Sequence, residues 1–263
     1  AVTGPSFEKS FLEVKGDSNL TARAYVSASG SSGTLAAGDY LKEHLNTRIA
    51  VVEAEECPTL IKNGYGEHSI QGIGDKHVPL IHNVMNTDFV VGVSDQATNN
   101  LNLIFNTDIG QKYLNTKKGL EINFVKRLPE FGFSAIANIL ASIKLSKYMG
   151  LGSEDAIITV ATDGAELYHS ELKKMKEDFI GIYDGFTCAE IFGQFLKGIS
   201  TENTIELNQR DKERIFNLGY YTWVEQQGID LNHFEMRKNQ NFWNDHYNYM
   251  ISLDHKVEEF NSM

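Results

Sequence analysis

A strand, a glycine-hydroxyl turn and a helix follow one another near the start of the chain, and this order constrains the fold more than any other feature. The apolar residues 22–28 predict a buried strand, and residues 35–43 predict a helix. Between them lies the sequence Gly-Ser-Ser-Gly-Thr at positions 30–34. Backbone N–H groups converge where such a turn enters a helix, so we expect an anion site for a phosphate. An ordinary turn that needs glycine for its backbone geometry is the alternative.

The composition argues against several classes of function. The chain has 263 residues, of which 41% are hydrophobic, enough for one large domain or two modest ones. Its formal net charge of −11 argues against a broad surface for nucleic acid or for an anionic membrane. Cys57 and Cys188 give no disulfide framework and no metal-binding spacing. Without a signal peptide or a run of about 18 apolar residues, the sequence predicts a cytoplasmic protein.

Strands and helices alternate up to about residue 170. Further strands are predicted at 48–53, 88–93 and 156–161, and helices follow Ser94 and Ser134. The continuous apolar run at 156–161 is typical of a central strand that is buried on both faces. This alternation predicts an α/β fold with an open, mostly parallel sheet and flanking helices.

The character of the sequence changes after residue 170. Aromatic and polar residues there punctuate helical stretches, and no strand is predicted. We therefore divide the chain into an α/β domain at 1–170, which would hold the phosphate site, and a mostly helical C-terminal extension at 171–263. The extension could cap the site or build an interface between subunits.

Three more segments resemble ligand-binding loops. They are Ile-Gln-Gly-Ile-Gly at 70–74, Gly-Phe-Ser-Ala at 132–135, and Asp-Gly-Ala-Glu-Leu-Tyr at 163–168. Open α/β sheets bind ligands at the carboxyl ends of their strands, and three of the four candidate loops follow or adjoin such ends. Each segment also has a plain structural interpretation, since 70–74 could be a simple loop and Ser134 a helix N-cap.

In this order the four segments, together with Val-Val-Glu at 51–53, resemble the second half of the fold-type II pyridoxal-phosphate enzymes. The similarity is greatest to the cysteine synthase and cystathionine β-synthase group, over about residues 20–170. The motif at 70–74 is identical to that of the family, whereas those at 132–135 and 163–168 match loosely. The family implies a homodimer with pyridoxal 5'-phosphate as cofactor and a small amino acid as substrate.

The resemblance also implies roles for single residues. Ser134 would lie near the pyridine nitrogen of the cofactor, and Gly72 and Gly74 would line its substrate face. A serine leaves that nitrogen largely unprotonated, which suits β-elimination and β-replacement on serine or cysteine derivatives. The cofactor phosphate would be held by the amides and hydroxyls of Gly30, Ser31, Ser32, Gly33 and Thr34.

Two departures from the family pattern qualify this expectation. The Schiff-base lysine of the family lies well upstream of its phosphate loop, but here only Lys9 and Lys15 precede Gly30, and neither has the family's sequence setting. We therefore expect a C-terminal portion that has no catalytic lysine and is inactive by itself, with the missing N-terminal portion as a possible partner. In addition, Ser32 replaces a more usual glycine, and Ala135 a more usual serine.

Other functions are also considered. A non-catalytic module that binds phosphate or free cofactor, or a subunit of a split enzyme, is the main alternative. A Rossmann-like nucleotide-binding protein is disfavoured by the glycine spacing, and no Gly-Lys-Ser/Thr follows the turn as in a P-loop. The spacing of His68, His77 and His82 fits no common zinc pattern, so no metal is expected.

Overall fold

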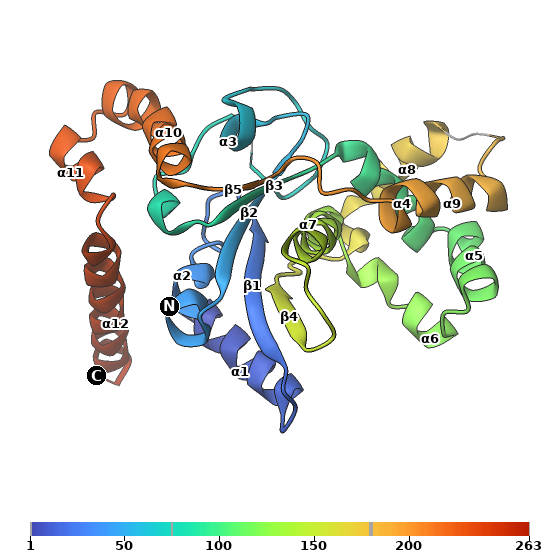
Figure 1. Cartoon of the computed structure of the whole chain (residues 1–263), viewed down its shortest axis with the longest axis horizontal. Coiled ribbons are helices and arrows are strands. Elements are labelled where there is room, and N and C mark those ends of the chain that lie inside the picture. Colours follow the sequence, from blue (N-terminus) through green and yellow to red (C-terminus); the bar gives the residue numbers. More distant parts are fainter. Residues whose placement is uncertain (1, 75, 179–180, 263) are drawn as a thin grey trace.

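The computed structural model describes residues 2–74, 76–178 and 181–262. Its centre is a five-stranded sheet in the order β4-β1-β2-β3-β5 (Figure 1). Parallel pairing joins β1 to β2 and β4, and β2 to β3, whereas β5 runs antiparallel to β3. The strands are β1 (Thr21–Ala28), β2 (Arg48–Ala54), β3 (Phe89–Val93), β4 (Asp155–Thr159) and β5 (Thr204–Glu206).

Helices cover both faces of the sheet. On one face α2 (Ala37–Leu45) packs on β1 and β2, and α1 (Thr3–Lys15) packs on α2. On the other face α7 (Phe133–Met149) crosses β1 and β3, with α4 (Asp95–Asn106) beside it. Alternate strand residues supply the two cores, because successive side chains of a strand point to opposite faces: Ala24 and Val26 face α7, and Tyr25 faces α2.

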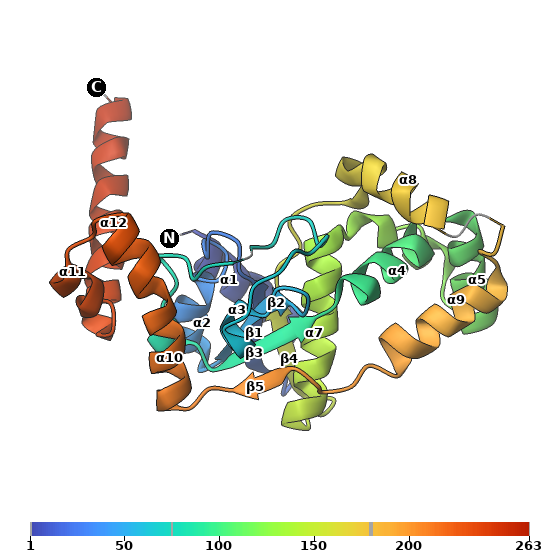
Figure 2. The same cartoon turned by 90° about the horizontal axis from the view of Figure 1, so that it is seen from above.

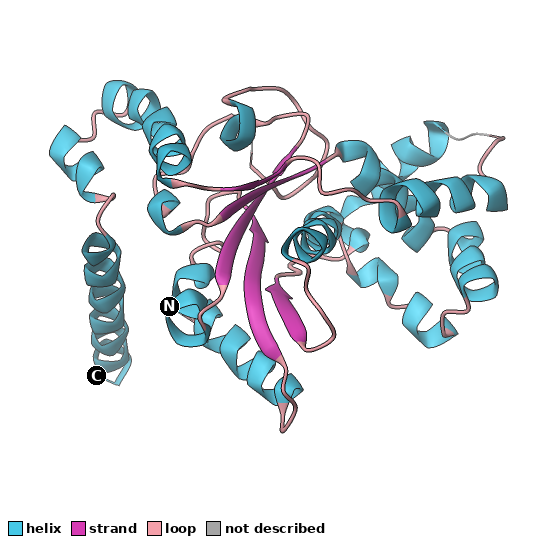
Figure 3. Cartoon of the chain, viewed as in Figure 1, coloured by secondary structure: helices cyan, strands magenta, loops and turns pink. Residues whose placement is uncertain are grey.

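The other helices gather at the two ends of the sheet (Figures 1 and 3). Beside α4 lie α5 (Asp108–Lys118), α6 (Ile122–Val125), α8 (His169–Asp178) and α9 (Gly185–Ile191). At the opposite end lie α10 (Gln209–Tyr220), α11 (Leu231–Met236) and α12 (Gln240–Ser262), and α12 projects away from the sheet (Figure 2). Short helical pieces are α3 (Thr59–Lys62), η1 (Val84–Asn86), η2 (Leu128–Glu130), η3 (Ala165–Tyr168), η4 (Phe192–Lys197) and η5 (Tyr221–Gln226).

The sheet confirms the predicted fold class and corrects two expectations. The run at 156–161 contributes β4, which lies at an edge of the sheet with every residue partly exposed, not at its centre. A continuous apolar run shows burial potential but does not give the position of a strand in a sheet. The second correction is β5, a strand in the region predicted to be helical, where Ile205 is the one apolar residue and gives no alternating pattern.

One helix begins later than predicted. Residues 34–36 form a turn, so α2 starts at Ala37. The helix after Ser94 ends at Asn106, because the Thr107 hydroxyl accepts a hydrogen bond from the Gly110 amide and starts α5. Within the described part of the chain, no helix combines the length and apolar character needed to span a membrane. The boundary between domains near residue 170 stays a prediction.

Candidate functional site

The turn after β1 is held by its own side chains. Ser32 has a left-handed backbone (φ 67°) and a nearly inaccessible side chain. Its hydroxyl lies 3.0 Å from the hydroxyl of Ser29, and the Ser27 hydroxyl donates to Thr34 Oγ1 at 3.0 Å. The Tyr25 hydroxyl donates to the Thr34 carbonyl at 2.7 Å. These contacts use hydroxyl and carbonyl groups and leave the turn amides out.

The amides of this turn find no acceptor among the described residues. No group of the described residues accepts a hydrogen bond from the N–H groups of positions 30–34. Ser31 and Gly33 are exposed, and a Cβ added to Gly33 would meet its nearest atom, Ser31 Oγ, only at 3.5 Å. Unpaired amides that open to solvent ahead of α2 form a cradle for an anion such as a phosphate. The geometry therefore fits the group that the sequence predicts.

The loop at 70–74 lies directly against this turn. The Gly74 amide donates to the Ser29 carbonyl at 2.6 Å, and the Gly72 carbonyl lies 3.7 Å from where a Gly30 Cβ would stand. Gly72 has φ +84°, a conformation that favours glycine. A Cβ on Gly74 would lie 2.6 Å from the Ser29 carbonyl. The two loops thus approach each other through their backbones.

Ser134 joins the same neighbourhood from the first turn of α7. The N-cap position of α7 is taken by Gly132, so the alternative interpretation of Ser134 as an N-cap is wrong. Its side chain is buried and lies 3.6 Å from where a Gly72 Cβ would stand. Its hydroxyl lies 3.5 Å from the hydroxyl of Thr162, which follows β4.

The segment at 163–168 completes the group. The Gly132 amide donates to the Asp163 carbonyl at 2.8 Å, and the Tyr168 hydroxyl donates to Asp163 Oδ2 at 2.5 Å. Burial and this carboxylate raise the pKa of Tyr168 to about 12. The Tyr168 hydroxyl lies 3.8 Å from the position of a Gly72 Cβ. All four candidate loops therefore meet at the carboxyl ends of β1 and β4.

Sequence reasoning missed Asn138, which fixes these strand ends. It lies one turn after Ser134 in α7 and is almost fully buried. Its Oδ1 accepts from the Ala28 amide at 2.8 Å, and its Nδ2 donates to the Val160 carbonyl at 2.9 Å. A polar amide among the mostly apolar buried positions of α7 was the available signal, because a buried amide needs partners.

Glu53, from the Val-Val-Glu motif, is placed outside this group. Its buried carboxylate accepts from the amides of Leu60 and Ile61, each at 2.8 Å, and so holds the start of α3. Burial is the main reason that its pKa rises to about 7, and the two amide hydrogen bonds oppose that rise. Its contacts are those of a structural carboxylate.

The three histidines lie in different surroundings. His68 Nε2 lies 3.1 Å from the Gly74 carbonyl, His77 packs edge-on to Trp223, and His82 contacts the Thr87 hydroxyl at 3.0 Å. Over the residues that the structure describes, no group of three potential metal ligands is assembled.

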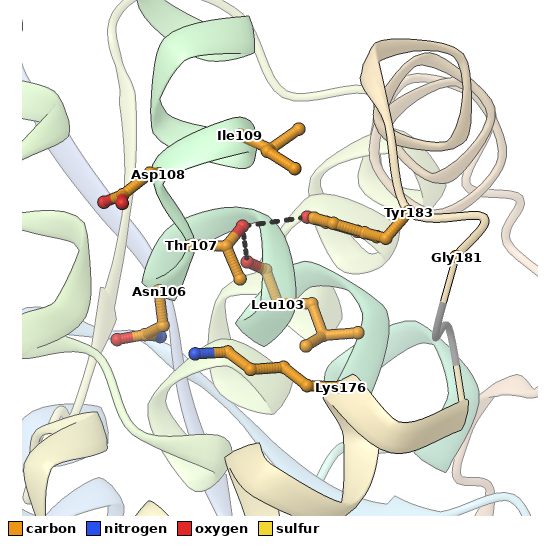
Figure 4. Close-up of a pocket in the computed structure, with 8 residues that line it drawn as sticks. All are labelled: Leu103, Asn106, Thr107, Asp108, Ile109, Lys176, Gly181 and Tyr183. Carbon is orange, nitrogen blue, oxygen red and sulfur yellow. Dashed lines mark hydrogen bonds between the residues drawn. The ribbon is translucent and has the colours of Figure 1, made fainter.

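A separate pocket lies away from the four loops. It has a volume of about 380 Å³ and lies among α4, α5 and α8 (Figure 4). Figure 4 shows the Tyr183 hydroxyl directed at Thr107, at 3.1 Å, and the Lys176 ammonium directed toward Asn106. It shares no residue with the four loops, and its lining consists of Leu103, Asn106, Thr107, Asp108, Ile109, Lys176, Gly181 and Tyr183.

Part of the chain is similar in sequence to a known protein. No family model matches the chain. Cysteine synthase B of Campylobacter jejuni is 32% identical over 161 residues, which are 60% of this chain and 46% of that protein. The chain thus spans about half the length of this curated relative.

Two solved structures are also matched over about half of their own length. A cysteine synthase from Entamoeba histolytica superposes with a TM-score of 0.51 and 20% identity, over 73% of this chain and 49% of that one. A hydrogen sulfide-producing enzyme from Fusobacterium nucleatum matches with a TM-score of 0.48 and 24% identity, over 65% and 47% of the two chains. The Entamoeba likeness shows the fold.

Proposed function

We propose that this chain, a relative of the fold-type II pyridoxal-phosphate enzymes of the cysteine synthase group, binds the phosphate of that cofactor in the turn at 30–34. The sequence match confirms the resemblance that the motifs indicate. The observation that carries the proposal is the set of unpaired, solvent-open amides at this turn, which precedes α2. A buried or internally bonded turn would not have fitted a phosphate.

The other loops would position the rest of the cofactor. Ser134 would lie near the pyridine nitrogen, and Gly72 and Gly74 would line the face that meets the substrate. The short approach of Gly74 to Ser29 supports this role, because only residues without a Cβ leave room there. When bound, pyridoxal phosphate supplies an electron sink for charge that develops at the α-carbon of an amino acid.

For the whole protein we propose a lyase or synthase that acts on a serine or cysteine derivative by β-elimination or β-replacement. The Ser134 hydroxyl, which is uncharged, would donate a hydrogen bond to the pyridine nitrogen without transferring its proton. We further propose a cytoplasmic setting and a homodimer, or an assembly with a portion that carries the catalytic lysine.

Lys9 and Lys15 do not suit the role of the Schiff-base lysine. Both lie on α1, which packs against α2, and Lys9 is exposed. Lys15 lies before β1 and the turn at 30–34 lies after it. The whole length of β1 therefore separates Lys15 from the turn. This placement favours, as the second candidate, a chain that binds the cofactor without turnover unless another polypeptide supplies the lysine.

Ligand titration tests the phosphate site. The purified chain is titrated with pyridoxal phosphate, with pyridoxal and with inorganic phosphate, and binding is followed by equilibrium dialysis. We expect pyridoxal phosphate to bind, phosphate to compete, and pyridoxal to bind at least tenfold more weakly because it has no dianionic group. Equal binding of pyridoxal and its phosphate would refute the site.

Two aspartate variants sharpen this test. Gly33→Asp places a carboxylate in the cradle, where space is open, and should abolish phosphate-dependent binding. Gly193→Asp, where a Cβ meets no atom within 4 Å, is the matched control and should bind as the parent does. Release of pyruvate or sulfide after mixing with a lysine-bearing portion separates the split enzyme from the binding module.

A further inference from the structure

Arg237 is a buried cation that forms no ion pair with the described residues. It follows α11, and its side chain is only 4% exposed. Its Nε and Nη1 are inaccessible and have no hydrogen-bond partner, and none of residues 2–74, 76–178 and 181–262 forms an ion pair with it. Burial alone lowers the pKa of this arginine to about 10, so it stays charged at neutral pH.

Two aromatic rings hold the guanidinium by its face. The guanidinium carbon lies 4.8 Å from the ring centre of Phe234 and 5.1 Å from that of Phe216. Both rings are fully buried, and their centres lie 4.7 Å apart. Such cation–π contacts stabilise the charge across the ring faces but give nothing to the N–H groups at the edge of the guanidinium.

No carboxylate of the described residues shifts the pKa of Arg237, for which burial is the only cause of change. His82 is buried nearby and neutral, because burial and then the charge of Arg237 lower its pKa to about 4. Asn83 and Gln240 form a reciprocal amide pair at 2.9 and 3.2 Å, which ties the loop after His82 to the start of α12. The amide pair uses its own hydrogen bonds, whereas His82 Nδ1, like the Nε and Nη1 of Arg237, is buried without a partner among the described residues.

We propose that Arg237 holds a small monovalent anion of the size of chloride, in a site separate from the turn at 30–34. An unpaired buried charge lowers the stability of the fold. A bound anion would supply the counter-charge and the hydrogen-bond acceptor that the described residues do not provide. The anion must be small, because so little of the side chain is open. Its binding would couple α11 and α12 to the loop before β3.

Thermal unfolding in two salts tests this site. The chain is melted in sodium chloride and in sodium gluconate at equal ionic strength, since gluconate is too large for so closed a site. We expect chloride to raise the melting temperature by roughly 2–5 °C, and Arg237→Met to remove this difference. Arg127→Met is the control and should keep it, because Arg127 is exposed and already paired with Glu130.

Further measurements keep the outcome decisive. Gly33→Asp should retain the chloride effect, and its loss there would place the anion at the turn and overturn the proposal. Crystals grown in bromide should show an anomalous peak beside Arg237 of the parent chain, which decides the matter if Arg237→Met does not fold. Equal melting in both salts and no bromide peak would mean that water satisfies the arginine.

Discussion

The amide of Gly74 donates to the carbonyl of Ser29 at 2.6 Å and joins two loops that are far apart in the sequence. A Cβ at position 74 would lie 2.6 Å from that carbonyl and 3.1 Å from the Gly30 Cα, both backbone atoms that cannot swing aside. We expect Gly74→Ala to separate the loops and to weaken binding of pyridoxal phosphate at least tenfold, about 1.4 kcal/mol. Fluorescence titration measures the loss.

Gly152→Ala is the matched control for this substitution. A Cβ there meets its nearest atom, Asp155 Oδ2, at 3.8 Å, which is an ordinary contact. Its affinity should equal that of the parent. If Gly74→Ala binds as tightly as Gly152→Ala, the loop at 70–74 does not border the cofactor site.

Ser32 offers a second test, because it holds a left-handed backbone where glycine is easier to accommodate. Ser32→Gly relieves this strain but removes the hydroxyl contact with Ser29, so we expect a net change within about 1 kcal/mol. Ser32→Ala loses the contact and keeps the strain, and should destabilise the fold more. Chemical denaturation of both variants checks this order, and an alanine variant as stable as the glycine variant would contradict it.

The positions of the four loops were predictable from sequence because each has a short-range signal. Glycines and hydroxyl residues between a strand and a helix predict the turn at 30–34. The order of the family motifs predicts the other three loops. The edge position of β4 was not predictable, since a run such as 156–161 records apolarity and not strand order. β5 was missed because Ile205, between Thr204 and Glu206, is too little pattern for a strand.

Contacts between residues that are distant in the sequence were also not predictable. Asn138 and Ala28 meet only after the sheet has formed, and no local pattern links them. Arg237 illustrates the same limit, because its burial against Phe216 depends on the packing of α11 against α10. Periodicity predicts elements, whereas such pairs follow from topology.

Asn138 should be more important for stability than its helix position suggests. Asn138→Ala leaves the Ala28 amide and the Val160 carbonyl without their partner, so we expect a loss of roughly 2–4 kcal/mol. Asn123→Ala, whose side chain is exposed and contacts Glu121, is the control and should cost under about 0.5 kcal/mol. Equal effects of both substitutions on urea unfolding would contradict this assignment.

The buried pair of Lys144 and Glu55 should respond unequally to loss of either partner. Lys144 Nζ lies 3.0 Å from Glu55 Oε1 and donates to the Gly92 carbonyl at 2.6 Å. The lysine side chain is 6% exposed and the glutamate 29%. Glu55→Gln therefore leaves the buried Lys144 ammonium without its counter-ion, whereas Lys144→Met leaves the Glu55 carboxylate, which water can reach.

We expect Glu55→Gln to cost about 3 kcal/mol and Lys144→Met clearly less. Denaturant unfolding of the single variants and of the double variant forms a cycle that isolates the interaction between the two charges. If Lys144→Met is the more damaging change, its packing against the sheet outweighs the charge, and the argument from unequal burial is wrong.

The buried carboxyl of Glu53 should make stability depend on pH near neutrality. Burial raises its pKa from 4.5 to about 7, so the folded chain binds a proton that the unfolded chain releases between these values. The stabilisation that this group gives is fully present below pH 4.5 and declines as the pH rises to about 7, by up to about 3 kcal/mol.

Glu53→Gln stays neutral, and it keeps an oxygen for one of the two amides of Leu60 and Ile61. The free energy of unfolding of Glu53→Gln minus that of the parent should therefore grow with pH over this range and level off above it. Glu13→Gln, at an exposed position of α1, is the control. A difference between Glu53→Gln and the parent that stays constant from pH 4.5 to 8 would show that Glu53 is ionised throughout and that its two amide bonds outweigh its burial.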